Sequence, residues 1–159
     1  MVVAFVGLGS NLSEPVAQVE SAIADLQVLP HSKLRARSSL YRTTPWGGVA
    51  QPDFVNAVVE LETTLPARTL MDELLAIERR LGRRRAAQRY GPRVIDLDLL
   101  MYGDVVIDEP GLRVPHPRLH ERAFVLVPLA EIAPAASIPQ QGSVAAALAV
   151  VDTASCARL

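Results

Sequence analysis

The sequence predicts an α+β fold, a ferredoxin-like sandwich in which helices cover one face of an antiparallel sheet. Alternating apolar segments and amphipathic helical segments follow one another in the order β-α-β-β-α-β, with a further helix near the C-terminus. The chain has 159 residues, of which 50% are hydrophobic, so it is long enough for one domain with its own core. We therefore expect a single domain over residues 1–159, with the uncovered sheet face open to ligands.

The first half of the chain predicts three strands and one helix. Residues 2–8 form an apolar run typical of a buried central strand, and Gly9-Ser10-Asn11 then turns the chain. This turn lacks the glycine spacing and the lysine of a phosphate-binding loop. A helix follows to about residue 28, with Ser13 as N-cap and Pro15 in its first turn. Alternation predicts strands over residues 34–42 and 54–61, separated by a loop rich in Gly and Pro.

The second half predicts a helix from Pro66 to Gly82, since proline favours the first turn of a helix and glycine commonly ends one. Residues 83–93 then form a mobile loop, and residues 94–101 alternate as a strand. A turn at Gly103-Asp104 leads into a small hairpin at residues 105–107. Helices are expected over residues 122–132, with Pro128 leaving the boundary open, and over residues 144–151.

Asp96 and Asp98 alternate with aliphatic residues in the strand at 94–101. They share one face, and the opposite face is formed by Ile95, Leu97, Leu99 and Met101. Residues two apart on a strand are separated by about 6.5 to 7 Å, so both carboxylates can bind one divalent cation, or two. Carboxylate oxygens favour Mg²⁺. The alternative is a pair of solvated carboxylates with no ligand.

Seven arginines lie between residues 79 and 93, whereas the whole chain has one lysine, Lys33. The planar guanidinium group suits phosphate oxygens better than an ammonium group does. Arg79 and Arg80 have a simpler explanation, because cations at a helix C-terminus favour the helix dipole. The other arginines follow Gly82 and precede the acidic strand. A basic loop beside an acidic pair favours a metal-polyphosphate substrate.

Three further residues stand out singly. Trp46 lies in the Gly- and Pro-rich loop, where it could cover a flat heterocycle or fold back onto the core. Asn56 puts an amide on an apolar strand, either as a partner for a heterocycle edge or as a satisfied core amide. His116 lies between two prolines, which favours a structural role, although Arg113 and Arg122 nearby make it a credible hydrogen-bond donor to phosphate.

Five segments in this order resemble the 6-hydroxymethyl-7,8-dihydropterin pyrophosphokinases of folate biosynthesis, from residue 2 to about residue 134. They are GSNL at residues 9–12, YRTTPWG at 41–47, QPDFVNAV at 51–58, the GR…GPRVIDLDLL run beginning at Gly82, and VPHPRLHERAFVLVPL at 114–129. The resemblance implies a ferredoxin-like enzyme in which ATP donates its terminal pyrophosphate to the hydroxymethyl group of the dihydropterin, which produces AMP.

The resemblance also implies roles for individual residues. Asp96 and Asp98 would hold two Mg²⁺ ions and act in catalysis together with Arg83 and Arg93. The ATP-binding residues would be Glu78, Arg85, Arg93, Leu99, Arg113, His116 and Arg122. The pterin-binding residues would be Thr43, Thr44, Pro45, Trp46, Phe54, Asn56, Tyr90 and Phe124. The chain departs from the usual family residues at Phe54, Tyr90 and Trp46, which affects the pterin pocket rather than the reaction.

Composition disfavours several other classes of protein. No segment is apolar enough to cross a membrane, and the N-terminus lacks the basic region of a signal peptide. Cys156 is the only cysteine, which excludes an internal disulfide and favours the cytoplasm. A net charge of −1 gives no general attraction to nucleic acid or membranes. We expect a cytoplasmic monomer; the alternatives are a non-catalytic Mg-nucleotide-binding domain and an RNA-binding domain, the latter disfavoured because paired sheet aromatics are missing.

Overall fold

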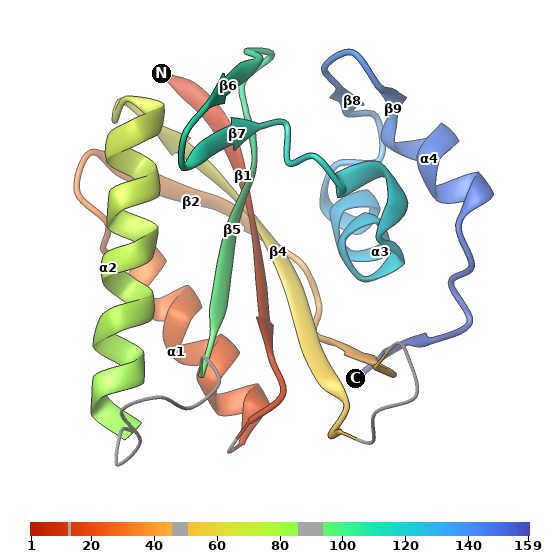
Figure 1. Cartoon of the computed structure of the whole chain (residues 1–159), viewed down its shortest axis with the longest axis horizontal. Helices are drawn as coiled ribbons and strands as arrows, with labels where there is room; N and C mark the ends of the chain where they lie inside the picture. Colours follow the sequence, from red (N-terminus) through yellow and green to blue (C-terminus); the bar gives the residue numbers. More distant parts are fainter. Residues whose placement is uncertain (13, 46–50, 86–93) are drawn as a thin grey trace.

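An antiparallel sheet runs through the centre of the computed structural model, which describes residues 1–12, 14–45, 51–85 and 94–159 (Figure 1). The strands follow the order β10-β3-β4-β1-β5, and β2 pairs with β4 beside β3. Their bounds are β1 Val2–Ser10, β2 Ser32–Arg37, β3 Tyr41–Thr43, β4 Phe54–Thr63, β5 Asp96–Tyr102 and β10 Cys156–Arg158.

Helices α1 (Pro15–Gln27) and α2 (Ala67–Arg85) pack on one face of this sheet, to its left in Figure 1. Their apolar stripes meet the sheet in one core cluster, which includes Ile23, Leu74 and Leu99. Because each helix has an apolar face at a period of about 3.6 residues, burying that face stabilises the helix and the sheet together.

Helices α3 (Ala123–Ile132) and α4 (Val144–Val150) lie on the opposite face, with a second core cluster that includes Phe5, Val58 and Leu126. The remaining elements are short: β6 Ile107–Glu109, β7 Leu112–Val114, the 3₁₀ turn η1 Leu119–Glu121, β8 Ser137–Ile138 and β9 Gly142–Ser143. The element order and the antiparallel sheet confirm the ferredoxin-like α+β class. Helices were expected on one face only, with the other face open to ligands, whereas α3 and α4 also pack on part of that second face.

The helix end predicted at Gly82 is wrong, because α2 continues to Arg85. A β-carbon at Gly82 would meet no atom within 4 Å, so this glycine has no special backbone role. A helical glycine costs only about 1 kcal/mol relative to alanine, and arginine is a good helix former. The predicted loop of residues 83–93 therefore begins at least three residues later.

Three other boundaries differ from the prediction. β1 extends through Gly9 to Ser10, so the turn follows these residues. The predicted strand of residues 34–42 is divided into β2 and β3, and the hairpin lies at β6–β7 rather than at residues 105–107. The residue before α1 is Glu14, with φ of 59° and no side-chain cap, and the predicted cap Ser13 lies outside the described residues.

An irregularity in β5 also changes which residues share a face. Phe5 pairs with Met101, but the next residue of β1, Val6, pairs with Leu99, so Leu100 is an extra residue in β5. Leu97 and Leu99 share a face as predicted, in the cluster with α1 and α2, whereas Leu100 and Met101 both belong to the cluster around α3. The assignment of Met101 to the face of Leu99 is therefore wrong.

None of the described helices is both long and apolar enough to span a membrane.

Candidate active site

Two glycines of β1, Gly7 and Gly9, put no side chain of their own on the sheet face that carries α3, and the side chains of Leu100 and Asn56 lie close above them. Gly9 pairs with Asn56 of β4 on one side and with Asp96 of β5 on the other. Gly7 lies two residues earlier on the same face and pairs with Asp98. We call these two residues the glycine row. Residues paired across a sheet share a face, so the acidic pair and Asn56 lie on either side of the glycine row. Their strands, β5 and β4, are two strand spacings apart, or about 9.5 Å.

The backbone of β5 between the two aspartates is held by a hydrogen bond to a side chain of α2. β5 is an edge strand, and the backbone N–H of Leu97, between the two aspartates, donates to Glu78 Oε2 of α2 at 2.7 Å. A carboxylate that accepts a backbone N–H forms a charge-assisted hydrogen bond, which is stronger than a neutral one. Glu78 therefore fixes the segment from which Asp96 and Asp98 project, as a support of the acidic pair.

His116 is placed beside this pair by its own backbone. Its N–H donates to the Leu100 carbonyl at 2.8 Å, and its Nδ1 accepts the Arg118 N–H at 3.2 Å. Burial lowers the pKa of His116 below its ordinary 6.5; Asp98 opposes this change, and Arg122 and Arg118 add to it. A neutral ring that accepts at Nδ1 carries its proton on Nε2. His116 is thus a neutral hydrogen-bond donor.

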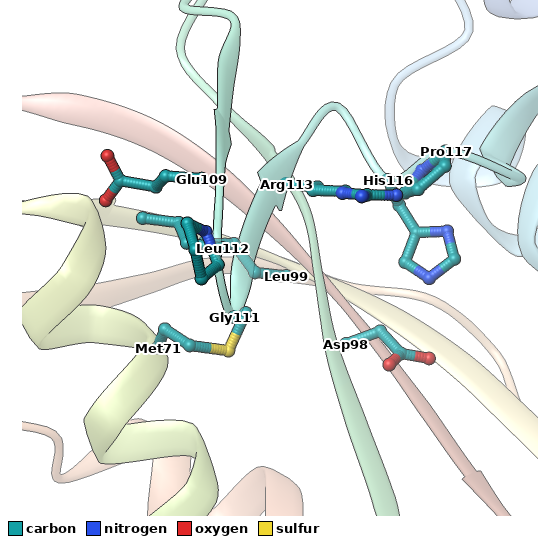
Figure 2. Close-up of a pocket in the computed structure, with 10 residues that line it drawn as sticks. Met71, Asp98, Leu99, Glu109, Gly111, Leu112, Arg113, His116 and Pro117 are labelled. Carbon is teal, nitrogen blue, oxygen red and sulfur yellow. The ribbon is translucent and has the colours of Figure 1, made fainter.

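A cavity of about 370 Å³ lies between α2, β5 and the β6–β7 hairpin, with Asp98 and His116 at one side (Figure 2). Of the predicted nucleotide-binding residues, Leu99, Arg113 and His116 line it. Met71 and Leu112 add apolar surface that the sequence did not single out as functional. Apolar walls with a few polar groups at one end are typical of small-molecule sites. The cavity therefore joins an apolar compartment to Asp98 of the acidic pair.

On the other side of the glycine row, two buried polar atoms have no hydrogen-bond partner among the described residues. They are Thr43 Oγ1 of β3 and Asn56 Oδ1 of β4. Asn56 is only 7% exposed, and its Nδ2 has a long 3.5 Å contact with the Leu8 carbonyl. An unsatisfied buried acceptor costs about 1 to 3 kcal/mol, so Asn56 Oδ1 is available to a ligand that brings a donor. The interpretation of Asn56 as a satisfied core amide is disfavoured.

Two of the aromatic residues predicted for the pterin, Phe54 and Phe124, lie in the described part of the chain. Phe54 pairs with Thr43 across β3 and β4 and is half-buried. Phe124 is the second residue of α3, and the Arg122 guanidinium lies 5.5 Å from the centre of its ring. A cation this close to a ring face is attracted to it, and the contact orients both side chains. Phe54 and Phe124 are thus supplied from different elements, the sheet and α3.

Several predicted residues are described only in part or not at all. Arg83 and Arg85 lie in the last turn of α2, but their side chains lie outside what the structure describes. Trp46, Tyr90 and Arg93 lie outside the described residues. Their predicted roles stay predictions. Thr44 and Pro45 follow β3, and the Thr44 N–H donates to the Ser155 carbonyl at 3.2 Å.

Sequence reasoning did not assign a function to Ser10 and Asn11, whose side chains form hydrogen bonds with residues of distant segments. The Ser10 hydroxyl donates to the Val94 carbonyl at 2.6 Å, two residues before Asp96. The Asn11 Nδ2 donates to Gln51 Oε1 at 3.1 Å and to the Pro52 carbonyl at 3.3 Å. The turn was interpreted as structural, and these bonds agree. Glycines at alternate positions of one strand were the signal for a functional face.

Solved structures with the same fold include the HPPK-DHPS chain of Plasmodium falciparum, with a TM-score of 0.69 and 14% identity over 94% of this chain. A second HPPK-DHPS structure, in complex with substrates, has a TM-score of 0.72 and 12% identity over 93% of this chain. The chain spans 43% of each of these longer chains. At such identities the likeness shows the fold alone, and it confirms the ferredoxin-like assignment.

Sequence relatives are much closer. A 2-amino-4-hydroxy-6-hydroxymethyldihydropteridine pyrophosphokinase of Pseudomonas aeruginosa is 47% identical over 85% of this chain and 83% of its own. The enzyme of that name from Haemophilus influenzae is 45% identical over 84% of this chain and 82% of its own. The family model for 7,8-dihydro-6-hydroxymethylpterin-pyrophosphokinase matches residues 5–134, which include both sides of the glycine row. The chain belongs to the 7,8-dihydro-6-hydroxymethylpterin-pyrophosphokinase family.

Proposed function

We propose that this chain transfers pyrophosphate from ATP to 6-hydroxymethyl-7,8-dihydropterin, giving AMP and the pterin diphosphate, a step of folate biosynthesis. Family membership supports an enzyme over a non-catalytic nucleotide-binding or RNA-binding domain. The observation that carries the proposal is the sheet face around the glycine row. It has polar atoms on β3 and β4 that find no partner among the described residues, an acidic pair on β5, and glycines on β1 between them.

Enzymes of this family use ATP and Mg²⁺, and the donors on β5 suit that ion. Asp96 and Asp98 offer hard oxygen ligands on one strand face. No group of three or more His, Cys, Asp and Glu residues that could enclose a metal occurs in the described part of the chain. Mg²⁺ commonly takes few protein carboxylates and fills its other positions with phosphate oxygens and water. Two carboxylates therefore fit Mg²⁺ that arrives with ATP, and we propose two ions, which would neutralise phosphate charge.

The nucleotide would occupy the cavity of Figure 2. Its base would lie against Leu99, Met71 and Leu112, and its phosphates would extend toward Asp98. His116 would donate from Nε2 to a phosphate oxygen, a contact that needs no positive charge on the ring. Arg113 and Arg122 would supply fixed positive charge, and Arg83, Arg85 and Arg93 are proposed to add to it from the basic segment.

The pterin would bind beyond the glycine row. Its pyrimidine ring offers N–H donors beside a carbonyl, and Asn56 Oδ1 is an acceptor that needs such a donor. Thr43 Oγ1 would accept from or donate to the same edge. Phe54 and Phe124 would stack on the ring faces. Thr44, Pro45, Trp46 and Tyr90 are proposed to complete the pocket.

In the reaction, the hydroxymethyl oxygen of the pterin attacks the β-phosphorus of ATP. The new bond joins that oxygen to the β-phosphorus, the bond from the β-phosphorus to the α,β-bridging oxygen breaks, and AMP leaves with both bonding electrons. The hydroxyl proton passes to solvent. Such a transfer needs positioning and charge neutralisation more than a protein nucleophile. The residues around the glycine row supply both.

A direct test is to incubate the protein with Mg-ATP and the hydroxymethyl dihydropterin and to separate the nucleotides. The expected products are AMP and pterin diphosphate in equal amounts, with no product when Mg²⁺ is removed. ADP with a pterin monophosphate would contradict the transfer, and ATP left unchanged would favour a nucleotide-binding domain. A monomer that acts without nucleic acid stays a prediction. Sedimentation of the pure protein tests its oligomeric state.

A further inference from the structure

The C-terminal strand β10 covers the outer edge of β3, the strand that carries Thr43. β3 has only three residues and pairs with β4 on its inner edge. On its outer edge, Cys156 pairs with Thr43 and Arg158 pairs with Tyr41. A three-residue edge strand has few hydrogen bonds of its own to define its position. Its register therefore depends on both neighbours.

Hydrogen bonds extend this pairing beyond both ends of β10. The Thr44 N–H donates to the Ser155 carbonyl at 3.2 Å, and the Leu159 N–H donates to the Leu40 carbonyl at 2.9 Å. In an antiparallel ladder, hydrogen-bonded pairs alternate, so Ala157 lies at the bonded position between these two, opposite Arg42. Residues 155–159 thus border the whole of β3 and also Thr44, the residue that follows it.

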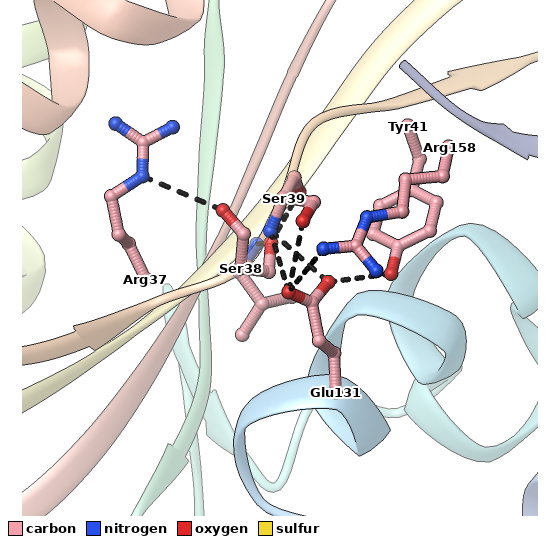
Figure 3. Close-up of polar contacts among 7 residues, drawn as sticks. Arg37, Ser38, Ser39, Tyr41, Glu131 and Arg158 are labelled. Atoms are coloured by element: carbon pink, nitrogen blue, oxygen red, sulfur yellow. Dashed lines mark hydrogen bonds and ion pairs between the residues drawn. The ribbon is translucent and has the colours of Figure 1, made fainter.

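Glu131 of α3 fastens this edge from the side (Figure 3). Its carboxylate accepts the Ser39 N–H at 3.0 Å, the Ser39 hydroxyl at 2.9 Å and the Tyr41 hydroxyl, and it lies 3.8 Å from Arg158. Burial and the bond to Glu131 raise the pKa of Tyr41 to about 12. One carboxylate therefore connects α3, the start of β3 and β10.

The position of β3 determines where Thr43 Oγ1 lies relative to Asn56 Oδ1 of β4, and neither atom has a hydrogen-bond partner among the described residues. Tyr41 pairs with Asn56, and Thr43 pairs with Phe54, so a shift of β3 moves Thr43 relative to Asn56. Both Thr43 Oγ1 and Asn56 Oδ1 are available to a ligand, and hydrogen bonds weaken steeply when their geometry is poor. A support that fixes β3 would thus act on the pterin side and leave the nucleotide cavity unchanged.

We propose that β10 and Glu131 are positioning elements that hold β3 in register, so that Thr43 and Asn56 present one fixed polar edge to the pterin. The proposal rests on the proposed function. Glu131 touches neither substrate in this arrangement. Its effect is on affinity for one of two substrates, which a general contribution to folding would not reproduce.

The test uses point variants of the full chain. Glu131→Ala removes the shared acceptor, and Glu131→Gln retains a side-chain carbonyl that can accept part of the bonds. Ala157→Pro removes a backbone N–H from the bonded position of β10. Glu20→Ala is the matched control, because Glu20 also accepts two side-chain hydrogen bonds, from Arg37, but it joins α1 to β2. Initial rates give kcat and KM for each substrate, and hydrogen exchange reports on residues 40–44.

Glu131→Ala and Ala157→Pro should raise KM for the pterin about tenfold, the cost of about one lost hydrogen bond in the pocket. The ATP dissociation constant and kcat at saturating pterin should change less than about twofold, which is small beside the tenfold change in the pterin KM. Amide exchange of Thr44 should be faster. Glu131→Gln should lie between wild type and Glu131→Ala, and Glu20→Ala should match wild type in KM.

An unchanged pterin KM with faster exchange at Thr44 would overturn the proposal, and so would equal losses for both substrates. If Glu131→Ala does not fold, Tyr41→Phe carries the test, because it removes only the hydroxyl that donates to Glu131 and should raise pterin KM in the same direction. Wild-type turnover is measured first. Its absence contradicts the proposed function, whereas normal wild-type turnover with unaltered variants contradicts only the positioning role.

Discussion

Replacing Gly9 by alanine should displace Asn56 without altering it. An ideal β-carbon at Gly9 lies 2.7 Å from Asn56 Nδ2, closer than real β-carbons approach other atoms. That atom is the end of a side chain, so the amide can turn aside and the fold should survive, with a loss of about 1 kcal/mol of stability. The turned amide no longer meets the pterin edge. We expect pterin binding to weaken by about 1 to 3 kcal/mol, or roughly 5- to 150-fold.

Equilibrium titration with the pterin, and separately with Mg-ATP, measures this change. The ATP dissociation constant should stay near that of wild type, because the nucleotide cavity lies across the glycine row. Asn56→Ala should give a loss of similar size, and in that background Gly9→Ala should add little, since the atom it displaces is gone. Unaltered pterin binding in Gly9→Ala with a displaced Asn56 would refute the assignment of the amide to the pterin. Fully additive losses would refute the route through Asn56.

Asp98→Asn should keep the fold but lower Mg²⁺-dependent turnover by at least about 100-fold, since charge stabilisation is commonly the largest catalytic contribution; near-normal turnover at ordinary Mg²⁺ would show a solvated carboxylate. Gly82→Ala should stabilise α2 by about 0.5 to 1 kcal/mol in thermal unfolding and leave kcat unchanged, because this glycine is helical. A large fall in kcat would show instead that the reaction depends on the backbone freedom of Gly82. Stability should also fall below about pH 4.5: bonds from Arg37 lower the pKa of Glu20, and for Glu131 burial raises the pKa but bonds from Tyr41 and Ser39 more than offset it. A carboxyl group whose pKa is lower in the folded protein stabilises the fold at pH values above its unfolded pKa, and this stabilisation is lost as the pH falls through its folded pKa. Urea denaturation of wild type and Glu131→Gln at pH 7 and pH 4 should show a smaller effect of pH on the stability of the variant.

Hydrophobic alternation and helical spacing were sufficient to predict the main elements. β4 and α3 were expected at residues 54–61 and 122–132, and they lie at Phe54–Thr63 and Ala123–Ile132. Each has a long apolar pattern, and Pro128 did not end α3. The acidic pair was also placed correctly on one face, because two-residue periodicity holds over residues 95–99.

Local patterns could not predict features that depend on distant partners. The extra residue at Leu100 is fixed by pairing with β1, and alternation alone assigned Met101 to the wrong face. β10 is three residues long and pairs with a strand more than one hundred residues earlier, so its own sequence carries no strand pattern. Gly82 was expected to end α2, but the favourable helix propensity of the following arginines prevails.

The candidate site could be predicted in part for the same reason. Asp96, Asp98, Asn56 and His116 have side chains whose chemistry is unusual in an apolar setting, so each could be singled out. The role of Gly7 and Gly9 comes from side chains on the neighbouring strands, which only the register reveals. Glu131 was not expected to act near the site, because α3 and β3 are separated by most of the chain.

The central claim is that the pterin and the metal lie on opposite sides of the glycine row. The most direct measurement is a crystal structure of the complex with the pterin, a non-hydrolysable ATP analogue and Mn²⁺ in place of Mg²⁺, with the metal located by anomalous scattering. The account requires the anomalous peak at the carboxylates of Asp96 and Asp98 and the pterin ring in hydrogen-bond contact with Asn56 Oδ1. A metal bound away from both aspartates, or a pterin on the β5 side of Gly9, would contradict it.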